Sequence, residues 1–165
     1  MKNDTLKLVN VLKECYGFND KDLKHLLNIF NKQGNKNDIT GACSLLKAMN
    51  KELIEILTDI DDSKKELHEI KEEIKYYELI LNDEDDEEVL SYICNQYSEL
   101  QEILTAIVER LTLQIQMKKN ADSLLKLCIS LLKSYLETYF TEYQAKRIFS
   151  GFEYNYVREY LFINE

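Results

Sequence analysis

The most regular feature of the chain is a heptad repeat of apolar residues between residues 38 and 81. With residue 39 as position a, every a position is aliphatic and most d positions are apolar. The a residues are Ile39, Leu46, Leu53, Ile60, Leu67, Ile74 and Leu81, and the d residues are Ala42, Met49, Ile56, Ser63, Ile70 and Tyr77. A seam that returns every 3.5 residues is typical of helices packed as a coiled coil. The pattern predicts one long helix over residues 38–81, with Asp38 as its candidate N-cap.

A second heptad repeat follows, displaced by two residues from the first. Its a positions are Leu90, Tyr97, Leu104, Leu111, Lys118, Leu125, Leu132 and Tyr139, and its d positions are Ile93, Leu100, Ile107, Gln114, Ala121, Cys128 and Tyr135. Because the frame breaks, residues 82–88 are predicted to form an acidic turn that reverses the chain. A second long helix is predicted over residues 89–142, and its polar stretch at 118–123 is the candidate position of a kink.

Shorter elements flank this helix pair. Residues 1–37 predict two short helices: one over 5–16 that ends at Gly17, and one over 20–32 with Asn19 as its N-cap. Gly34 is predicted to adopt a left-handed conformation after the second of them. Residues 143–165 form an aromatic-rich tail, which Ser150 and Gly151 divide into two short helical pieces.

The predicted fold is therefore all-α. We expect a long, coiled-coil-like antiparallel helical hairpin, with short N-terminal and C-terminal helices forming a bundle at one end of a single domain. Apolar residues cover nearly the whole circumference of residues 124–132, so the N-terminal helices and the tail are expected to wrap this part. The chain has no proline and four glycines in 165 residues, which favours long uninterrupted helices.

The charge is concentrated on one stretch. Residues 51–88 carry sixteen acidic and five basic side chains, while the whole chain has a net charge of −9. The acidic turn has three interpretations: a solvated loop that favours the next helix N-terminus, a docking site for a basic protein, or a weak calcium site. The glycine and spacing of an EF-hand are missing. The candidate partner-binding residues in the turn are Asp83, Glu84, Asp85, Asp86, Glu87 and Glu88.

Aromatic residues are concentrated near the C-terminus. Ten of the seventeen Phe and Tyr residues lie between residues 135 and 162. Tyrosine suits surfaces that are apolar in the ring and wet at the hydroxyl, so these residues either close the core of the bundle or form an interface. Both readings stay open. The candidate partner-binding residues in the tail are Tyr143, Phe149, Phe152, Tyr154, Tyr156 and Tyr160.

The reactive side chains do not form a catalytic pattern. The four cysteines are widely spaced and fall on apolar helix faces, which predicts buried, reduced thiols. His25 and His68 are flanked by charged residues and are predicted to lie on the surface. Motifs for phosphate cradles, zinc hydrolases, serine hydrolases and di-metal bundles do not occur. We therefore expect no enzymatic activity, no metal and no cofactor.

The partner is expected to be another protein. An acidic chain disfavours direct nucleic-acid binding, although residues 1–37 are basic enough to mimic a helix-turn-helix. Without a signal-like segment or an 18-residue apolar run, no membrane is expected, and the location is expected to be cytoplasmic, the host cytoplasm for a viral protein.

The leading functional hypothesis is a non-enzymatic protein–protein interaction module, acting as an adaptor, chaperone, scaffold or inhibitor through a helical hairpin surface. Leftover apolar surface favours a homodimer. The alternative is an acidic nucleic-acid mimic that inhibits a nucleic-acid-binding protein, such as a phage or mobile-element anti-defence factor.

Overall fold

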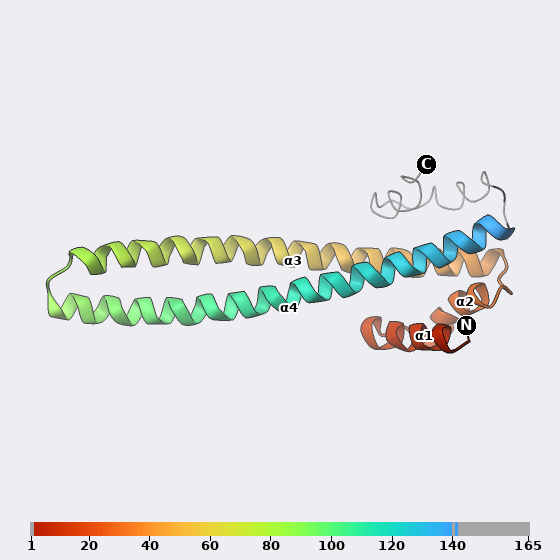
Figure 1. The fold of residues 1–165 in the computed structure, drawn as a ribbon, viewed down its shortest axis with the longest axis horizontal. Coiled ribbons are helices and arrows are strands. Elements are labelled where there is room, and N and C mark those ends of the chain that lie inside the picture. Colours follow the sequence, from red (N-terminus) through yellow and green to blue (C-terminus); the bar gives the residue numbers. More distant parts are fainter. Residues whose placement is uncertain (1, 140, 142–165) are drawn as a thin grey trace. The chain divides into compact units, whose positions relative to one another are not determined.

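The computed structural model describes residues 2–139 and 141, and this part of the chain contains four helices and no strand. The helices are α1 (Lys2–Tyr16), α2 (Asp20–Phe30), α3 (Lys36–Asp83) and α4 (Glu87–Tyr139), as Figure 1 shows. The predicted all-α hairpin is confirmed. The helical pieces predicted in the tail fall outside the described residues.

The chain divides into two compact units. One comprises residues 54–120 and is called the hairpin unit below; the other comprises residues 1–53 and 121–165 and is called the bundle unit. Both α3 and α4 contribute to each unit. The boundary in α4 lies between residues 120 and 121, next to the predicted kink, and α4 stays helical through residues 118–123.

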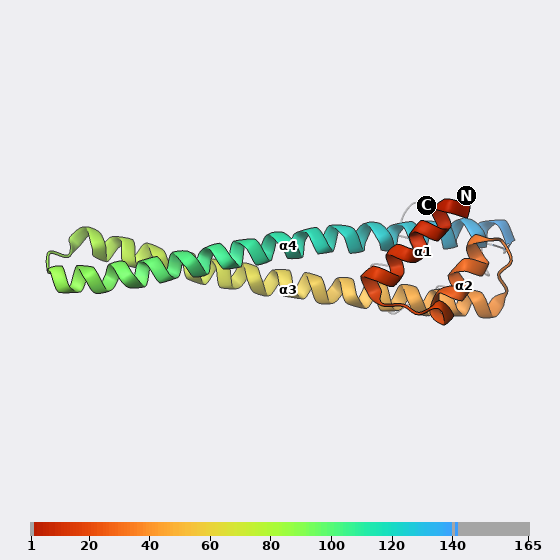
Figure 2. The same cartoon turned by 90° about the horizontal axis from the view of Figure 1, so that it is seen from below.

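In the hairpin unit, α3 and α4 run antiparallel and are joined by a short turn (Figure 2). The predicted seam is buried on both helices, at Ile56, Ile60, Ser63, Ile74, Ile93, Leu100 and Ile107. The register is set by two cross-helix pairs. Glu66 and Arg110, both at g positions, form an ion pair, and the Tyr97 hydroxyl donates to Glu78 Oε1 at 3.1 Å. Lys118 is the one a position of α4 in this unit that is exposed.

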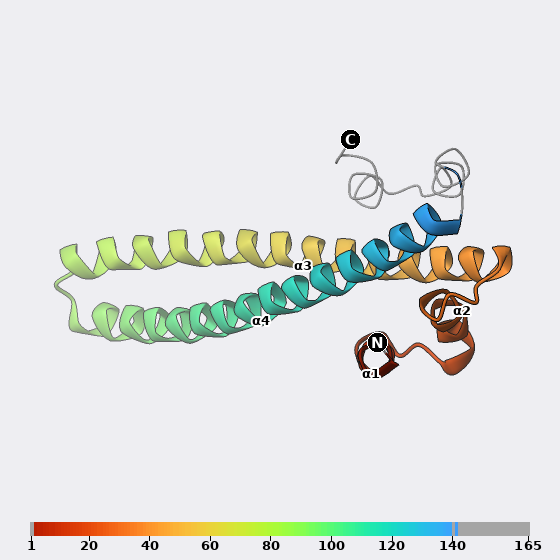
Figure 3. The same cartoon turned by 45° about the vertical axis from the view of Figure 1, so that its right-hand side comes forward.

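In the bundle unit, α1 and α2 pack against α3 and α4 on the same side of the pair (Figure 3). Large apolar side chains from all four helices form the core. Those with almost no exposed surface include Leu12, Leu23, Leu26, Ile29, Leu46, Met49, Leu125 and Leu132. Burial of each such side chain contributes about 1.5–3 kcal/mol to the stability of the fold. This contribution explains why the two short helices stay packed on α3 and α4.

Helix ends are fixed by local hydrogen bonds. Asn19 caps α2 as predicted, and its side chain and that of Asp22 form a reciprocal capping box. Gly17 ends α1 with a φ of +65°. The predicted N-cap of α3 is wrong, because the helix begins one turn earlier. Asn35 is the cap, and its Oδ1 accepts from the backbone N–H groups of Asn37 at 2.9 Å and Asp38 at 3.1 Å.

The predicted role of Gly34 is also wrong. The left-handed residue after α2 is Lys32, with a φ of +59°. Gly34 instead lets Tyr135 of α4 approach, and the Tyr135 hydroxyl donates to the Gly34 carbonyl at 2.7 Å. A Cβ at this position would lie 3.0 Å from that hydroxyl. Gly34 therefore serves a packing contact between segments 101 residues apart.

Two predictions about burial are corrected by the structure. Cys43 and Cys128 are buried, but Cys15 and Cys94 are exposed, so only half of the expected buried thiols are found. The circumference of residues 124–132 is not fully covered either. Leu127 and Leu131 are 46% and 37% exposed and line a groove of about 370 Å³ beside α1 and α2. In the described part of the chain, no helix has the length and apolar character to cross a bilayer.

Candidate functional site

The acidic turn is shorter than predicted and is partly organised by its own carboxylates. Since α3 ends at Asp83 and α4 begins at Glu87, only residues 84–86 lie between the helices. Glu84 Oε1 accepts from the backbone N–H groups of residues 85 and 86, at 3.1 and 3.0 Å. Asp86 Oδ1 accepts from those of residues 88 and 89, at 2.9 and 3.3 Å. Asp86 is thus the N-cap of α4.

The remaining turn carboxylates face water. Glu87 and Glu88 occupy the first turn of α4, where the positive end of the helix dipole favours acidic side chains. Asp83 and Asp85 are exposed. The six acidic residues therefore serve the chain reversal in part, and four of them remain available to a basic partner. Among residues 2–139 and 141, no group of three or more His, Cys, Asp or Glu could hold a metal ion.

The tail residues predicted as a second binding surface cannot be placed against this turn. Tyr143, Phe149, Phe152, Tyr154, Tyr156 and Tyr160 all lie outside the described residues.

A surface that the heptad reading did not single out lies on α4 of the hairpin unit. Five large apolar side chains at g and c positions share one side of the helix and are each between 39% and 63% exposed. They are Val89, Tyr92, Ile103, Leu113 and Met117, called the α4 stripe below. Two more apolar residues, Val108 and Ile115, are 45% and 48% exposed at e positions on the opposite side of the seam.

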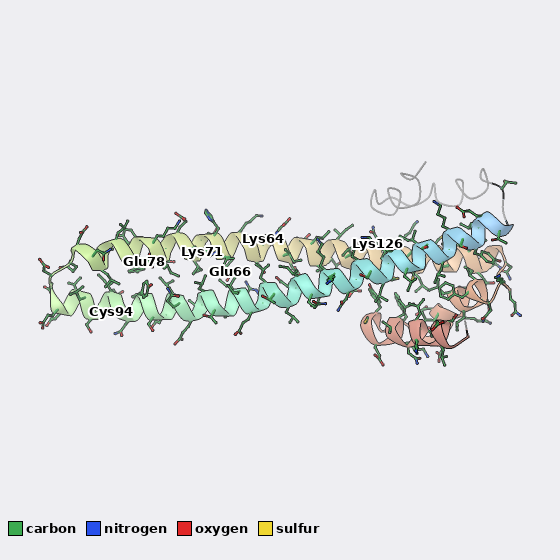
Figure 4. The ribbon with its side chains drawn as sticks, viewed as in Figure 1. Lys64, Glu66, Lys71, Glu78, Cys94 and Lys126 are labelled. Carbon is green, nitrogen blue, oxygen red and sulfur yellow. The ribbon has the colours of Figure 1, made fainter. Side chains whose placement is uncertain are left out.

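The flanks of α3 in the same unit are charged. Its g positions 59, 66 and 73 are acidic, and Lys64, Lys71 and Glu78 occupy its e positions (Figure 4). Residues 54–83 carry ten acidic and four basic side chains, whereas residues 89–117 carry three acidic and one basic. The acidity of the hairpin unit thus belongs to α3 and the turn, while the outer side of α4 is apolar and close to neutral.

The seam beneath part of the α4 stripe is polar. Ser63 is 3% exposed at a d position of α3, and the register set by the Glu66–Arg110 pair places it opposite Leu111, while Gln114 of α4 lies in the next layer, opposite Ile60. The Oε1 atom of Gln114 is buried and has no hydrogen-bond partner among the described residues. These two polar positions hold the helices less firmly than apolar ones would. The neighbouring Leu113 and Met117 point outward, so their apolar surface adds nothing to the hairpin itself.

A second polar cluster joins α2 to the start of α3 in the bundle unit. The buried Asp38 carboxylate accepts from His25 Nδ1 at 2.9 Å, Asn28 Nδ2 at 3.1 Å and the Asn35 backbone N–H at 2.9 Å. The backbone hydrogen bond from Asn35, and then that from His25, hold the pKa of Asp38 below its usual value. His25 is half-buried, with its side chain 36% exposed, so the predicted surface position holds only in part.

The His25 ring packs on α3 at Gly41, a position that has no side chain. A Cβ at Gly41 would lie 2.2 Å from His25 Cδ2 and 2.4 Å from Cγ, so the imidazole packs directly on the helix backbone. The spacing of His25 and Asn28, one turn apart on α2, was a usable sequence signal for a shared partner. The cluster ties α2 to the first turn of α3, which is a structural role. His68 is exposed, as predicted.

Comparison with protein-family models gives no match, and neither the curated proteins nor the solved structures include one that resembles this chain significantly.

Proposed function

We propose that the chain is a non-enzymatic protein–protein interaction module that binds through the hairpin unit. The observation that carries this proposal is the α4 stripe, a row of large apolar side chains left exposed on a helix whose seam is already occupied. Apolar e, g and c positions widen the surface that a helix can bury, and they are typical of helices packed in bundles of more than two. Adaptor, chaperone, scaffold and inhibitor are the classes of function that such a surface serves.

The energy available from covering the stripe is substantial. Completing the burial of a half-exposed Ile, Leu, Met or Tyr side chain contributes on the order of 1 kcal/mol. Five side chains on each of two equivalent surfaces therefore supply roughly 10 kcal/mol before the entropic cost of association is subtracted. That sum supports a specific complex.

The partner that fits best is a second copy of the chain. Two copies that meet through α4 bring together neutral, apolar surfaces and keep the acidic α3 helices and turns in solvent. Meeting through α3 would oppose like charges, which costs free energy. Two copies related by a two-fold axis would join their hairpins into a four-helix assembly. Two-fold dimers are the commonest closed oligomers of soluble proteins.

Sedimentation equilibrium of three full-length proteins tests the proposal. The wild type is expected to be a dimer, and Ile103→Glu with Leu113→Glu is expected to be a monomer of unchanged helix content. The matched control is Tyr76→Glu with Leu79→Glu, because those side chains are 62% and 66% exposed on the outer side of α3. The control should remain dimeric. A stripe variant that dimerises like the wild type would exclude the α4 stripe as the interface.

The acidic mimic remains the second candidate, supported by the segregation of carboxylates onto α3 and the turn. The sharpest variant neutralises only the four turn residues that make no capping bond: Asp83, Asp85, Glu87 and Glu88. Glu84 and Asp86 stay, because they hold the turn. If the chain mimics nucleic acid, this variant loses binding to a basic nucleic-acid-binding protein from the native host, while the stripe variant keeps it. The opposite pattern favours the α4 stripe.

A further inference from the structure

The α4 stripe belongs to a second heptad series on α4, and two opposite charges interrupt that series. The g and c positions of the hairpin unit recur at alternating steps of three and four residues, which is the spacing of a coiled-coil seam. In order they are Val89, Tyr92, Gln96, Glu99, Ile103, Ala106, Arg110, Leu113 and Met117. Both Glu99 and Arg110 are exposed. Charges inside an apolar seam oppose association unless each meets a group of opposite charge.

These two charges disfavour a parallel pair of copies. In a parallel two-fold dimer each position of the seam faces itself, so Glu99 would meet the partner's Glu99 and Arg110 would meet the partner's Arg110. The acidic turns of the two copies would also lie at the same end of the interface. Like charges repel in both places, and a parallel arrangement therefore loses much of what the apolar residues supply.

An antiparallel pair centred between residues 104 and 105 brings the opposite charges together. Each g position then faces a c position of the other copy, and two positions face each other when their numbers add to 209, as 99 and 110 do. Glu99 meets the partner's Arg110, and the two-fold axis forms this pair twice. Arg110 also pairs with Glu66 of its own chain, and its five N–H donors are enough for both carboxylates. The acidic turns lie at opposite ends of this interface.

The apolar positions agree with the same register. Near the two-fold axis Ile103 meets the small side chain of the partner's Ala106, so the two helices can approach closely. Tyr92 meets the partner's Met117, which is a favourable contact between sulfur and an aromatic ring. Sliding one copy by a heptad in either direction would place Glu99 against the partner's Ile103 or the partner's Met117. One register therefore satisfies the charges and the shapes together.

We infer that two copies join through α4 as an antiparallel pair in which Glu99 of each copy binds Arg110 of the other, a step that rests on the proposed function because it needs a dimer at the α4 stripe. The two charged residues set the orientation and the register of the dimer. They also select the partner, because an apolar helix without an acidic and a basic residue at this spacing leaves both charges without a counter-charge.

One pair of residues opposes the same dimer and so provides a test of opposite sign. The f positions flank the new seam as g positions flank the seam between α3 and α4. The ion pair of Glu66 and Arg110 shows that flanking positions of antiparallel helices meet when their numbers add to two more than those of facing seam residues. At the new interface that sum is 211, so Glu102 faces the partner's Glu109. This repulsion also occurs twice.

Two identical charge changes three residues apart should therefore have opposite effects. In sedimentation equilibrium of the full-length proteins at low salt, Glu99→Arg should raise the dimer dissociation constant about ten-fold, as expected for two reversed ion pairs. Glu102→Arg should lower it by roughly three- to ten-fold, because it replaces two repulsions by attractions. In a parallel dimer, Glu99→Arg exchanges one like-charge contact for another, and an unchanged dissociation constant would overturn the antiparallel arrangement.

Disulfide formation across the interface tests the register directly. The exposed Cys15 and Cys94 are first replaced by serine. Gln96→Cys and Leu113→Cys proteins are then oxidised in air with copper phenanthroline, each alone and as a mixture. Positions 96 and 113 add to 209, so a disulfide-linked dimer should form in the mixture and not in either protein alone, since a disulfide joins only residues that lie close together.

The outcomes separate the orientation from the proposed function. Cross-linking of each cysteine protein alone means that the copies are parallel, which overturns the inference and leaves the dimer. Absence of any cross-link in proteins that sediment as dimers means a different register, with the same consequence. A monomeric wild type overturns the proposed function and the inference with it. If the cysteine proteins lose their helical circular dichroism, the comparison of Glu99→Arg with Glu102→Arg decides: opposite shifts support the antiparallel pair, and shifts of the same sign overturn it.

Discussion

Gly41→Ala is expected to destabilise the bundle unit, although the same change stabilises most helices. In a helix interior, alanine is better than glycine by roughly 0.5–1 kcal/mol. At Gly41 the new methyl group would lie 2.2 Å from His25 Cδ2, so the imidazole must move away. His25 then loses its 2.9 Å hydrogen bond to the buried Asp38 carboxylate. A hydrogen bond to a charged group contributes about 1.5–3 kcal/mol.

The balance of these terms is a net loss of about 1–2 kcal/mol for Gly41→Ala. Because the His25 Cβ would itself lie 2.9 Å from the new methyl group, the background must be His25→Gly. There the close contacts with His25 and the hydrogen bond are all gone, so Gly41→Ala should stabilise by roughly 0.5–1 kcal/mol. The sign of the effect therefore reverses between the two backgrounds. The four proteins of this cycle give a coupling free energy of about 2 kcal/mol.

Urea unfolding followed by circular dichroism measures all four proteins at the same neutral pH. The expected midpoints fall for Gly41→Ala in the wild type and rise for it in His25→Gly. An increase in stability in both backgrounds would refute the reasoning, because it would mean that the imidazole does not pack on Gly41. A decrease in both would show that the methyl group meets something other than His25.

Three further predictions follow from single contacts. Tyr135→Phe removes the 2.7 Å bond to the Gly34 carbonyl and should cost about 1 kcal/mol in urea unfolding; no loss would mean that water replaces the hydroxyl. Because the folded pKa of Asp38 lies below its usual value, its stabilisation is fully present above the ordinary aspartate pKa of about 3.9 and is lost as the pH falls through the folded pKa. Asp38→Asn should flatten this acid limb in pH-dependent unfolding, and an unchanged limb would contradict it. Glu66 and Arg110 are each 47% exposed, so removing their pair should cost under about 1 kcal/mol, and exchanging the two residues should restore stability at low salt.

The long helices and their register could be predicted because one repeated physical cause acts along the whole sequence. Each apolar a or d residue gains from the same burial, and twelve of the thirteen successive a and d positions of α3, all but Ser63, are apolar. All thirteen are buried or half-buried in the structure. The two-residue change of frame likewise marked the reversal, although the turn itself is shorter than the acidic stretch.

The start of α3 could not be predicted, because two good capping residues compete there. Asn35 and Asp38 are both favourable N-caps, and local sequence does not separate them. The outcome depends on partners from another helix: the Asp38 carboxylate binds His25 and Asn28 of α2 and so sits inside the first turn. The role of Gly34 depends in the same way on Tyr135, which lies 101 residues away.

The α4 stripe was missed for a different reason. A search for a and d residues finds the seam of a two-helix pair and ignores the positions beside it. Reading the g and c positions as well would have shown that Ile103, Leu113 and Met117 are apolar where α3 has charged residues. The sequence held this signal, whereas burial in the structure was needed to show which of these side chains remain exposed.

The most direct test of the α4 stripe is the fluorescence of a Leu113→Trp variant at increasing protein concentration. The chain has no other tryptophan, so the emission reports only this position. If a second copy covers the stripe, the emission should shift to shorter wavelength as concentration rises, and adding Ile103→Glu should abolish the shift. Emission typical of a water-exposed indole at every concentration, in a protein of normal helix content, would contradict the proposed interface.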